Sequence, residues 1–189
     1  METLSKGEQE RLARLRASRM RRVRLVVVWL IIVAVVAAGG YWLVIAARKA
    51  ETQKPGVAIP DQGQEHIALG QDGPTYNSNP PTSGPHYPET TTWGVHDVQP
   101  PDEFLIHNLE HGGIWISYRD PQNQELIGKL KEIVAQYAIK VVLTPRPEND
   151  SAIAVAAWGR LLKLEEFDRQ QILDFIKAFI NKGPEQVPF

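Results

Sequence analysis

The feature that most restricts what this chain can fold into is an uncharged apolar stretch near its N-terminus. The 23 residues from Leu25 to Ala47 contain no Asp, Glu, Lys or Arg. As a helix they would extend about 34 Å, enough to cross the hydrocarbon core of a bilayer. Trp29 lies near one end and Trp42 near the other, where aromatic residues of membrane spans usually sit. The stretch therefore predicts one N-terminal transmembrane helix.

The charge distribution predicts how that helix is oriented. Residues 1–24 carry a formal net charge of +5 and the remaining residues carry −6. Because basic flanks stay on the cytoplasmic side, we expect a cytoplasmic N-terminus and an extracytoplasmic C-terminal part. A cleaved signal peptide is the alternative, since Ala37, Ala38 and Gly39 form a small-residue run, but the apolar stretch is longer than a usual signal-peptide core. The acidic remainder argues against nucleic-acid binding, which requires a basic face.

Composition divides the chain into four expected segments. They are a basic cytoplasmic segment over 1–24, a membrane anchor over 25–47, a polar linker over 48–64 and an extracytoplasmic domain over 65–189. The chain has no cysteine, and its two methionines precede the apolar stretch. Any metal site in the domain must therefore use nitrogen and oxygen ligands. Such ligands disfavour Cu(I) and leave Zn²⁺, Cu(II), iron or manganese.

The apolar pattern after residue 113 predicts a small α+β domain. Strands are expected over 114–118, 140–144 and 153–164, with a bulge at Gly159 in the last. One helix should begin at Asp120 and Pro121, and a second should begin at Asp168 and end at Gly183. Their apolar faces consist of Leu126, Ile127, Leu130, Ile133, Val134 and Tyr137 in the first, and Ile172, Phe175, Ile176, Phe179 and Ile180 in the second. We expect a mostly antiparallel sheet with both helices on one face, and ferredoxin-like connectivity is the nearest guess.

The side chains best suited to metal binding or catalysis are concentrated in the sequence HNLEHGG, which begins at His107. His107 and His111 are four residues apart, a spacing that on a helix places both rings on one face, close enough to share a metal ion. On a strand they would lie about 13 Å apart. Two prolines and two acidic residues precede the motif and two glycines follow it. These flanks predict a short helix over 102–111.

The same residues form an H-x-x-E-H pattern, in which two histidines bind zinc and the glutamate is the general base of a hydrolase. In that interpretation Glu110 is the base. A third-ligand motif is missing, although Glu185 is a candidate. The alternative without a metal is that both histidines are interior groups hydrogen-bonded to the backbone.

The segment between His66 and Pro101 is rich in Gly, Pro, Asn, Ser and Thr, and we expect a long loop with little regular structure. Its prolines and its aromatic residues Tyr76, Tyr87 and Trp93 favour an ordered, shaped loop. A proline-rich ligand for another protein is a further interpretation.

Four motifs together resemble a bacterial family called domain of unknown function 3105. They are the stretch from Tyr76 through PPTSGPHY, HNLEHGG at His107, the stretch AWGR that contains Trp158, and GPE ending at Glu185. The resemblance covers roughly residues 65–186 and includes His66, His86, His107 and His111, whereas His96 departs from the pattern. It implies membrane-anchored or exported proteins and no established activity.

All five histidines lie between residues 66 and 111, as expected of a site built from loops on a rigid scaffold. We predict a divalent metal site, zinc or copper(II), with His107 and His111 as central ligands, His86 as the third and His66 as the fourth. Glu110 or Asp97 would not bind the metal but would orient one imidazole by accepting a hydrogen bond from its other ring nitrogen. A closed site predicts metal storage or delivery, an open site predicts a hydrolase, and a non-metal interaction module is the third hypothesis.

Overall fold

The computed structural model describes residues 6–52 and 54–185, and the chain forms two compact units, Met1–Gln53 and Lys54–Phe189. Of the expected segments, residues 1–5 of the basic segment, residue 53 of the linker and residues 186–189 of the domain lie outside the described residues. The two units are described separately below.

The first unit is a single long helix, α1, over Lys6–Thr52. Within its section Arg19–Lys49, an 18-residue window has a mean hydropathy of 2.5, and none of that window is buried. It is the one helix among the described residues that is long and apolar enough to cross a membrane, and an N-terminal signal sequence meets the same criterion. Bulky apolar side chains such as Trp29 and Trp42 are exposed along it.

The second unit is built on a mixed six-stranded sheet with the order β1-β6-β5-β3-β4-β2. The strands β2 and β4 and the strands β3 and β4 pair in parallel, while the other three ladders are antiparallel. The sheet and its helices confirm the predicted α+β class. The strands are β1 Val57–Ala58, β2 Gly94–Val95, β3 Ile114–Tyr118, β4 Val141–Pro145, β5 Ile153–Ala157 and β6 Arg160–Leu164.

The connectivity differs from the ferredoxin-like guess. In a ferredoxin-like sheet the two strands joined by a helix are separated by another strand. Here β3 and β4, which are joined by α3 (Gln124–Val134), are direct neighbours over five residue pairs. The next strand, β5, pairs with the other edge of β3. Apolar patterns identify strands but do not specify their neighbours, so the sequence left this choice open.

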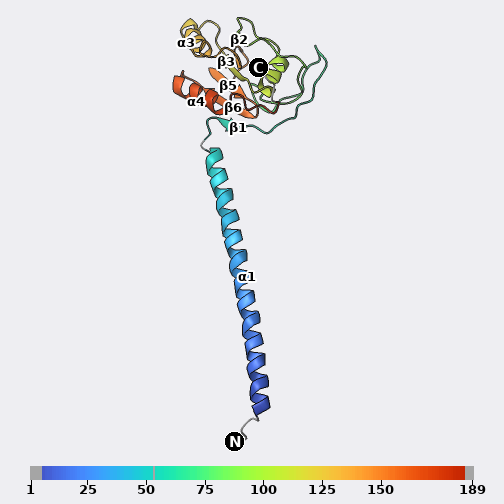
Figure 1. Cartoon of the computed structure of the whole chain (residues 1–189). Helices are drawn as coiled ribbons and strands as arrows, with labels where there is room; N and C mark the ends of the chain where they lie inside the picture. Colours follow the sequence, from blue (N-terminus) through green and yellow to red (C-terminus); the bar gives the residue numbers. More distant parts are fainter. Residues whose placement is uncertain (1–5, 53, 186–189) are drawn as a thin grey trace. The chain divides into compact units, whose positions relative to one another are not determined.

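Helices cover the two faces of the sheet differently. The apolar faces of α3 and of α4 (Arg169–Phe179) pack into one core with alternate residues of β3 to β6. On the opposite face, Leu105 and Leu109 of α2 (Asp102–Glu110) pack on Trp115 of β3. Figure 1 shows α3 and α4 on one side of the sheet, and the light-green α2 with the long loop before it on the other. The prediction of two helices on one face is therefore confirmed.

Three local predictions were wrong. The expected strand 153–164 is a hairpin, because Gly159 adopts a φ of +64° and closes a two-residue turn between Ala157 and Arg160. The helix expected at Asp120 begins three residues later, where the side chain of Asn123 accepts a hydrogen bond from the amide of Leu126. The last helix ends at Phe179, before the expected stop at Gly183.

The long loop is ordered by contacts with the rest of the domain. The guanidinium of Arg146, just after β4, donates to both carboxylate oxygens of Asp102 and to the side chains of Asn79 and Asn149. Asp102 begins α2 and Asn79 lies within the loop, so one buried cation ties both to the sheet. Residues 94–95 of the loop add the edge strand β2.

A candidate metal centre

The helix α2 presents three polar side chains at its C-terminal end. Asp102 and Glu103 occupy its first turn, where negative side chains interact favourably with the positive end of the helix dipole. The helix ends at Glu110, and two residues later the backbone turns at Gly112, whose φ of +76° suits glycine. Because Leu105 and Leu109 face the sheet, His107, Glu110 and His111 point elsewhere, on the i, i+3 and i+4 positions of one face. The predicted helix and its register are confirmed.

The long loop places two more histidines beside that helix end. His66 and His86 form an isolated parallel bridge, in which the amide of Ile67 donates to the carbonyl of His86 at 2.8 Å. The backbone turns at Gly84, where φ is +118° and a Cβ would press on the ring of Tyr76. This turn carries His86 into the interior, where its side chain has no exposed surface.

We call His66, His86, His107 and Glu110 the inner group, because their potential ligand atoms all lie within 4.8 Å of one another. The Oε2 atom of Glu110 is 2.9 Å from Nε2 of His86, 3.8 Å from Nε2 of His66 and 3.9 Å from Nε2 of His107. Tetrahedral ligands about 2.0 Å from an ion are separated from one another by about 3.3 Å. The inner group therefore needs only small adjustments to surround one ion.

Hydrogen bonds to the backbone determine which nitrogen faces the inner group. Nδ1 of His86 donates to the carbonyl of Gly84 at 2.7 Å, and Nδ1 of His107 donates to the carbonyl of Tyr87 at 2.7 Å. Carbonyls only accept, so Nδ1 carries the proton and, in each neutral ring, Nε2 presents a lone pair. Metal-binding histidines are oriented in this way.

The lone pair on Nε2 of His86 faces the carboxylate of Glu110, and the two groups repel each other when nothing lies between them. A neutral imidazole with Nδ1 protonated cannot donate from Nε2 to a carboxylate 2.9 Å away. The contact is favourable only with a proton or a metal cation between the two atoms. Glu110 is almost fully buried, so an uncompensated carboxylate there would be costly. The pair therefore defines a site for a positive charge.

His107 also belongs to a second group, which we call the outer group, with His111 and Glu185. Nε2 of His107 lies 2.9 Å from Nε2 of His111, which lies 3.1 Å from Oε2 of Glu185. The segment after α4 brings Glu185 here, with its amide donating to the carbonyl of Glu110 at 3.1 Å. A Cβ at Gly183 would overlap that carbonyl and the amide of Gly112, so the close approach requires glycine.

Burial lowers the pKa of two basic side chains in this region. Burial lowers the pKa of His107, reinforced by the neighbouring imidazoles of His111 and His86 and opposed by Glu110 and by the hydrogen bond to Tyr87. Burial also lowers the pKa of Lys140, whose ammonium donates to the carbonyl of His111 and lies 5.7 Å from the ring centre of Trp93. A low pKa keeps His107 neutral, the form that binds metals.

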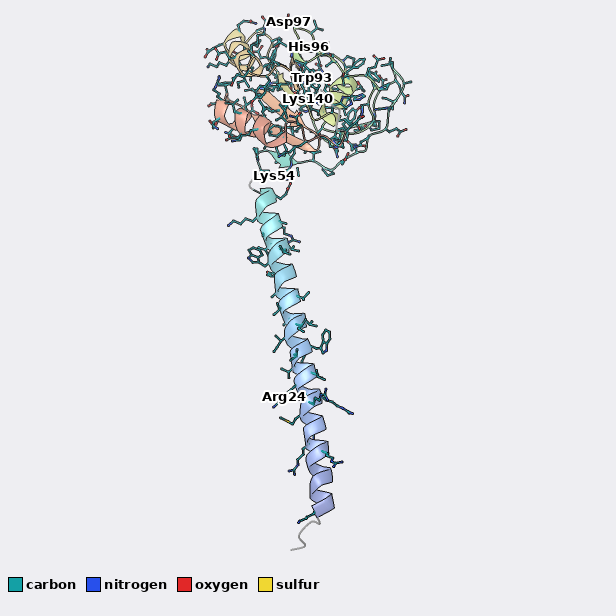
Figure 2. All side chains as sticks on the ribbon, in the orientation of Figure 1. Arg24, Lys54, Trp93, His96, Asp97 and Lys140 are labelled. Atoms are coloured by element: carbon teal, nitrogen blue, oxygen red, sulfur yellow. The ribbon has the colours of Figure 1, made fainter. Side chains whose placement is uncertain are left out.

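The structure brings His66, His86 and His107 together around Glu110, whereas His111, predicted as a central ligand, lies in the outer group with His107 and Glu185. Other predicted residues lie elsewhere. His96 instead donates from Nε2 to the carbonyl of Thr92, and Asp97 is exposed, 3.7 Å from Lys131. Figure 2 shows both labelled residues beside Trp93 and Lys140, in the part of the domain around β2. Glu110 lies among the histidine nitrogens rather than behind them. The sequence indicated Glu185 only as a candidate, because nothing local places it beside His111.

The fold and site define a class of protein: a small α+β domain with a histidine and carboxylate cluster, on the sheet face opposite its two amphipathic helices. The profile of the family described as protein of unknown function (DUF3105) matches residues 70–188, and the chain belongs to that family. The resemblance found in the motifs is thereby confirmed. Neither a curated protein nor a solved structure matches the chain.

Proposed function

We propose that the inner group binds one divalent metal ion and that the protein is a membrane-anchored, extracytoplasmic module for metal storage or delivery. The observation that carries this proposal is the convergence of three imidazole Nε2 atoms on the buried carboxylate of Glu110. Histidines with a purely structural role need hydrogen-bond partners for their polar atoms. That role does not require several ring nitrogens to converge on one point. A single cation satisfies all four groups at once.

The ligand chemistry favours zinc or copper(II). Three imidazoles and a carboxylate are borderline ligands that suit Zn²⁺ and Cu(II), and the chain has no cysteine to select Cu(I). The backbone carbonyls of Gly84 and Tyr87 orient two of the rings. In metal sites such outer partners contribute about 10-fold to 100-fold in affinity.

The position of Glu110 supports binding over hydrolysis. A general base must reach a water molecule on the metal. Glu110 is buried and its Oε2 atom contacts His86, which supports a role as a ligand or charge partner. The site has the four donors of a closed tetrahedral sphere and leaves no position for substrate unless His66 departs.

Elemental analysis of the full chain tests the proposal. The chain, purified in detergent without a histidine tag, would be incubated with Zn²⁺ or Cu²⁺ and desalted. We expect about one metal per chain in the wild type and in His96→Ala, a matched control outside both groups. His86→Ala and Glu110→Gln should retain little metal. A metal-free wild type, or equal retention in folded His86→Ala, would refute the inner group as the site. Equal retention in folded Glu110→Gln would remove Glu110 from the ligands.

A further inference from the structure

We infer that His111 and Glu185 form an outer exchange position, through which a single ion passes between solvent and the inner group. This inference rests on the proposed metal binding and concerns the route of the ion. His107 belongs to both groups, so it is the shared ligand at both positions.

The number of lone pairs on His107 argues for one ion at a time. Its Nδ1 atom donates to the carbonyl of Tyr87, which leaves Nε2 as its one metal-binding atom. A neutral imidazole nitrogen binds one ion. Two ions cannot both hold His107, so the two groups describe alternative positions of the same ion.

The exposed fraction of the side chains decreases from Glu185 and His111 to His107 and His86, which indicates the direction of the route. The side chain of Glu185 is 52% exposed and that of His111 is 18% exposed, whereas His107 is 6% and His86 is 0% exposed. On this side a hydrated cation meets the exposed carboxylate of Glu185 and the ring of His111 before it reaches the buried donors. The other approach to the inner group is past His66, whose side chain is 47% exposed. The outer group supplies three ligands and leaves room for water, as expected of an intermediate.

Ligand exchange between the two positions is chemically balanced without any reactant beyond water. An ion held by His107, His111 and Glu185 exchanges its waters and the last two ligands for His86, Glu110 and His66. His107 stays bound throughout, so the ion is never fully released in a buried place. The oxidation state does not change. His111 donates from Nε2 to Nε2 of His107 in the metal-free site, so it must pass that proton to solvent or hold it on Nδ1 before Nε2 can bind the ion.

The inference predicts effects of opposite sign for the two groups. We would load the full chain in detergent with one equivalent of Zn²⁺, add excess EDTA and follow release by elemental analysis of rapidly desalted samples. The double variant His111→Gln, Glu185→Gln should retain one zinc per chain but release it at least about tenfold more slowly. His66→Ala, which removes an inner ligand, should release zinc faster. Glu166→Gln, an exposed carboxylate in neither group, is the matched control.

Each other outcome overturns the inference and is distinct from failure of the proposed function. A double variant that releases zinc at the wild-type rate removes the exchange role while leaving the inner site intact. A folded double variant without zinc makes His111 and Glu185 resident ligands. Two zinc ions per wild-type chain would show both groups filled together. A wild type that binds no zinc or copper instead refutes the proposed function itself.

Discussion

The Nε2 atom of His86 lies 2.9 Å from the Oε2 atom of Glu110, although the two residues come from a loop and a helix. Both side chains are buried, and the other nitrogen of His86 is already engaged with a backbone carbonyl. The contact therefore requires a positive charge between its partners.

The charge of Glu110 should control metal affinity. Glu110→Gln keeps the shape of the side chain but removes the negative charge, so we expect metal affinity to fall by about 10-fold or more. Competition with a chromogenic chelator measures this change. Glu185→Gln is the comparison and should change equilibrium affinity much less. A hydrolase in which Glu110 acts only as base would show the opposite result, with affinity retained and turnover lost.

Two core substitutions should separate stability from metal binding. Leu109 and Ile133 are both fully buried, but Leu109 packs beside the site and Ile133 packs on the opposite face of the sheet. Each change to Ala should lower the free energy of unfolding by about 2–5 kcal/mol, measured by urea denaturation. Only Leu109→Ala should also weaken metal binding, because it loosens the helix that carries His107 and Glu110. Equal affinities in the two variants would contradict this coupling.

Acidification should destabilise the metal-free domain. Burial lowers the pKa of His107, so just below its ordinary value of about 6.5 the unfolded chain binds more protons than the folded chain. Stability therefore rises with pH through this window and falls as the pH decreases from about 7 to 5. Thermal unfolding in EDTA, followed by near-ultraviolet circular dichroism, measures the slope. His107→Gln should flatten it, and an unchanged slope would count against the assigned cause.

Two glycines offer a matched test of the contact between the C-terminal segment and α2. A Cβ at Gly183 would overlap the backbone of Glu110, whereas a Cβ at Gly128 in α3 would meet no atom within 4 Å. Gly183→Ala should cost about 1–3 kcal/mol of stability by overpacking and move Glu185 away from His111. Gly128→Ala should stabilise the helix by about 0.5–1 kcal/mol. Urea denaturation compares them, and similar effects of both changes would be inconsistent with the tight contact.

The proposed membrane orientation can be tested by labelling, because this sequence has no cysteine and an introduced one is then its single reactive thiol. Arg14 precedes the apolar stretch and Gln64 follows it, and both side chains are exposed. In intact bacterial cells a membrane-impermeant maleimide should label Gln64→Cys, whereas Arg14→Cys should react only after lysis. The reverse pattern would refute the orientation. Loss of the N-terminal segment from the mature protein would favour a signal peptide.

Much of the local structure followed from the sequence. The bounds of α2 were predictable from the spacing of His107 and His111 and from the flanking Pro101 and Gly112, because these signals act within one or two helical turns. Periodic apolar residues likewise predicted the buried faces of α3 and α4. The turn at Gly159 was missed because a glycine between two apolar runs fits a bulge as well as a hairpin.

The sequence alone thus determined the longer helices and the central strands, but not the short strands β1 and β2 or the hairpin turn at Gly159, and it assigned chemistry to the histidines. Only the tertiary structure places His66 and His86 beside the end of α2, with Glu110 among their nitrogens. It also brings Glu185 into contact with His111. The physical reason is the sequence separation over which each signal acts, because apolar periodicity and helix capping involve only residues that are near neighbours in the chain. The meeting of His111 with a residue 74 positions away depends on how the whole core packs.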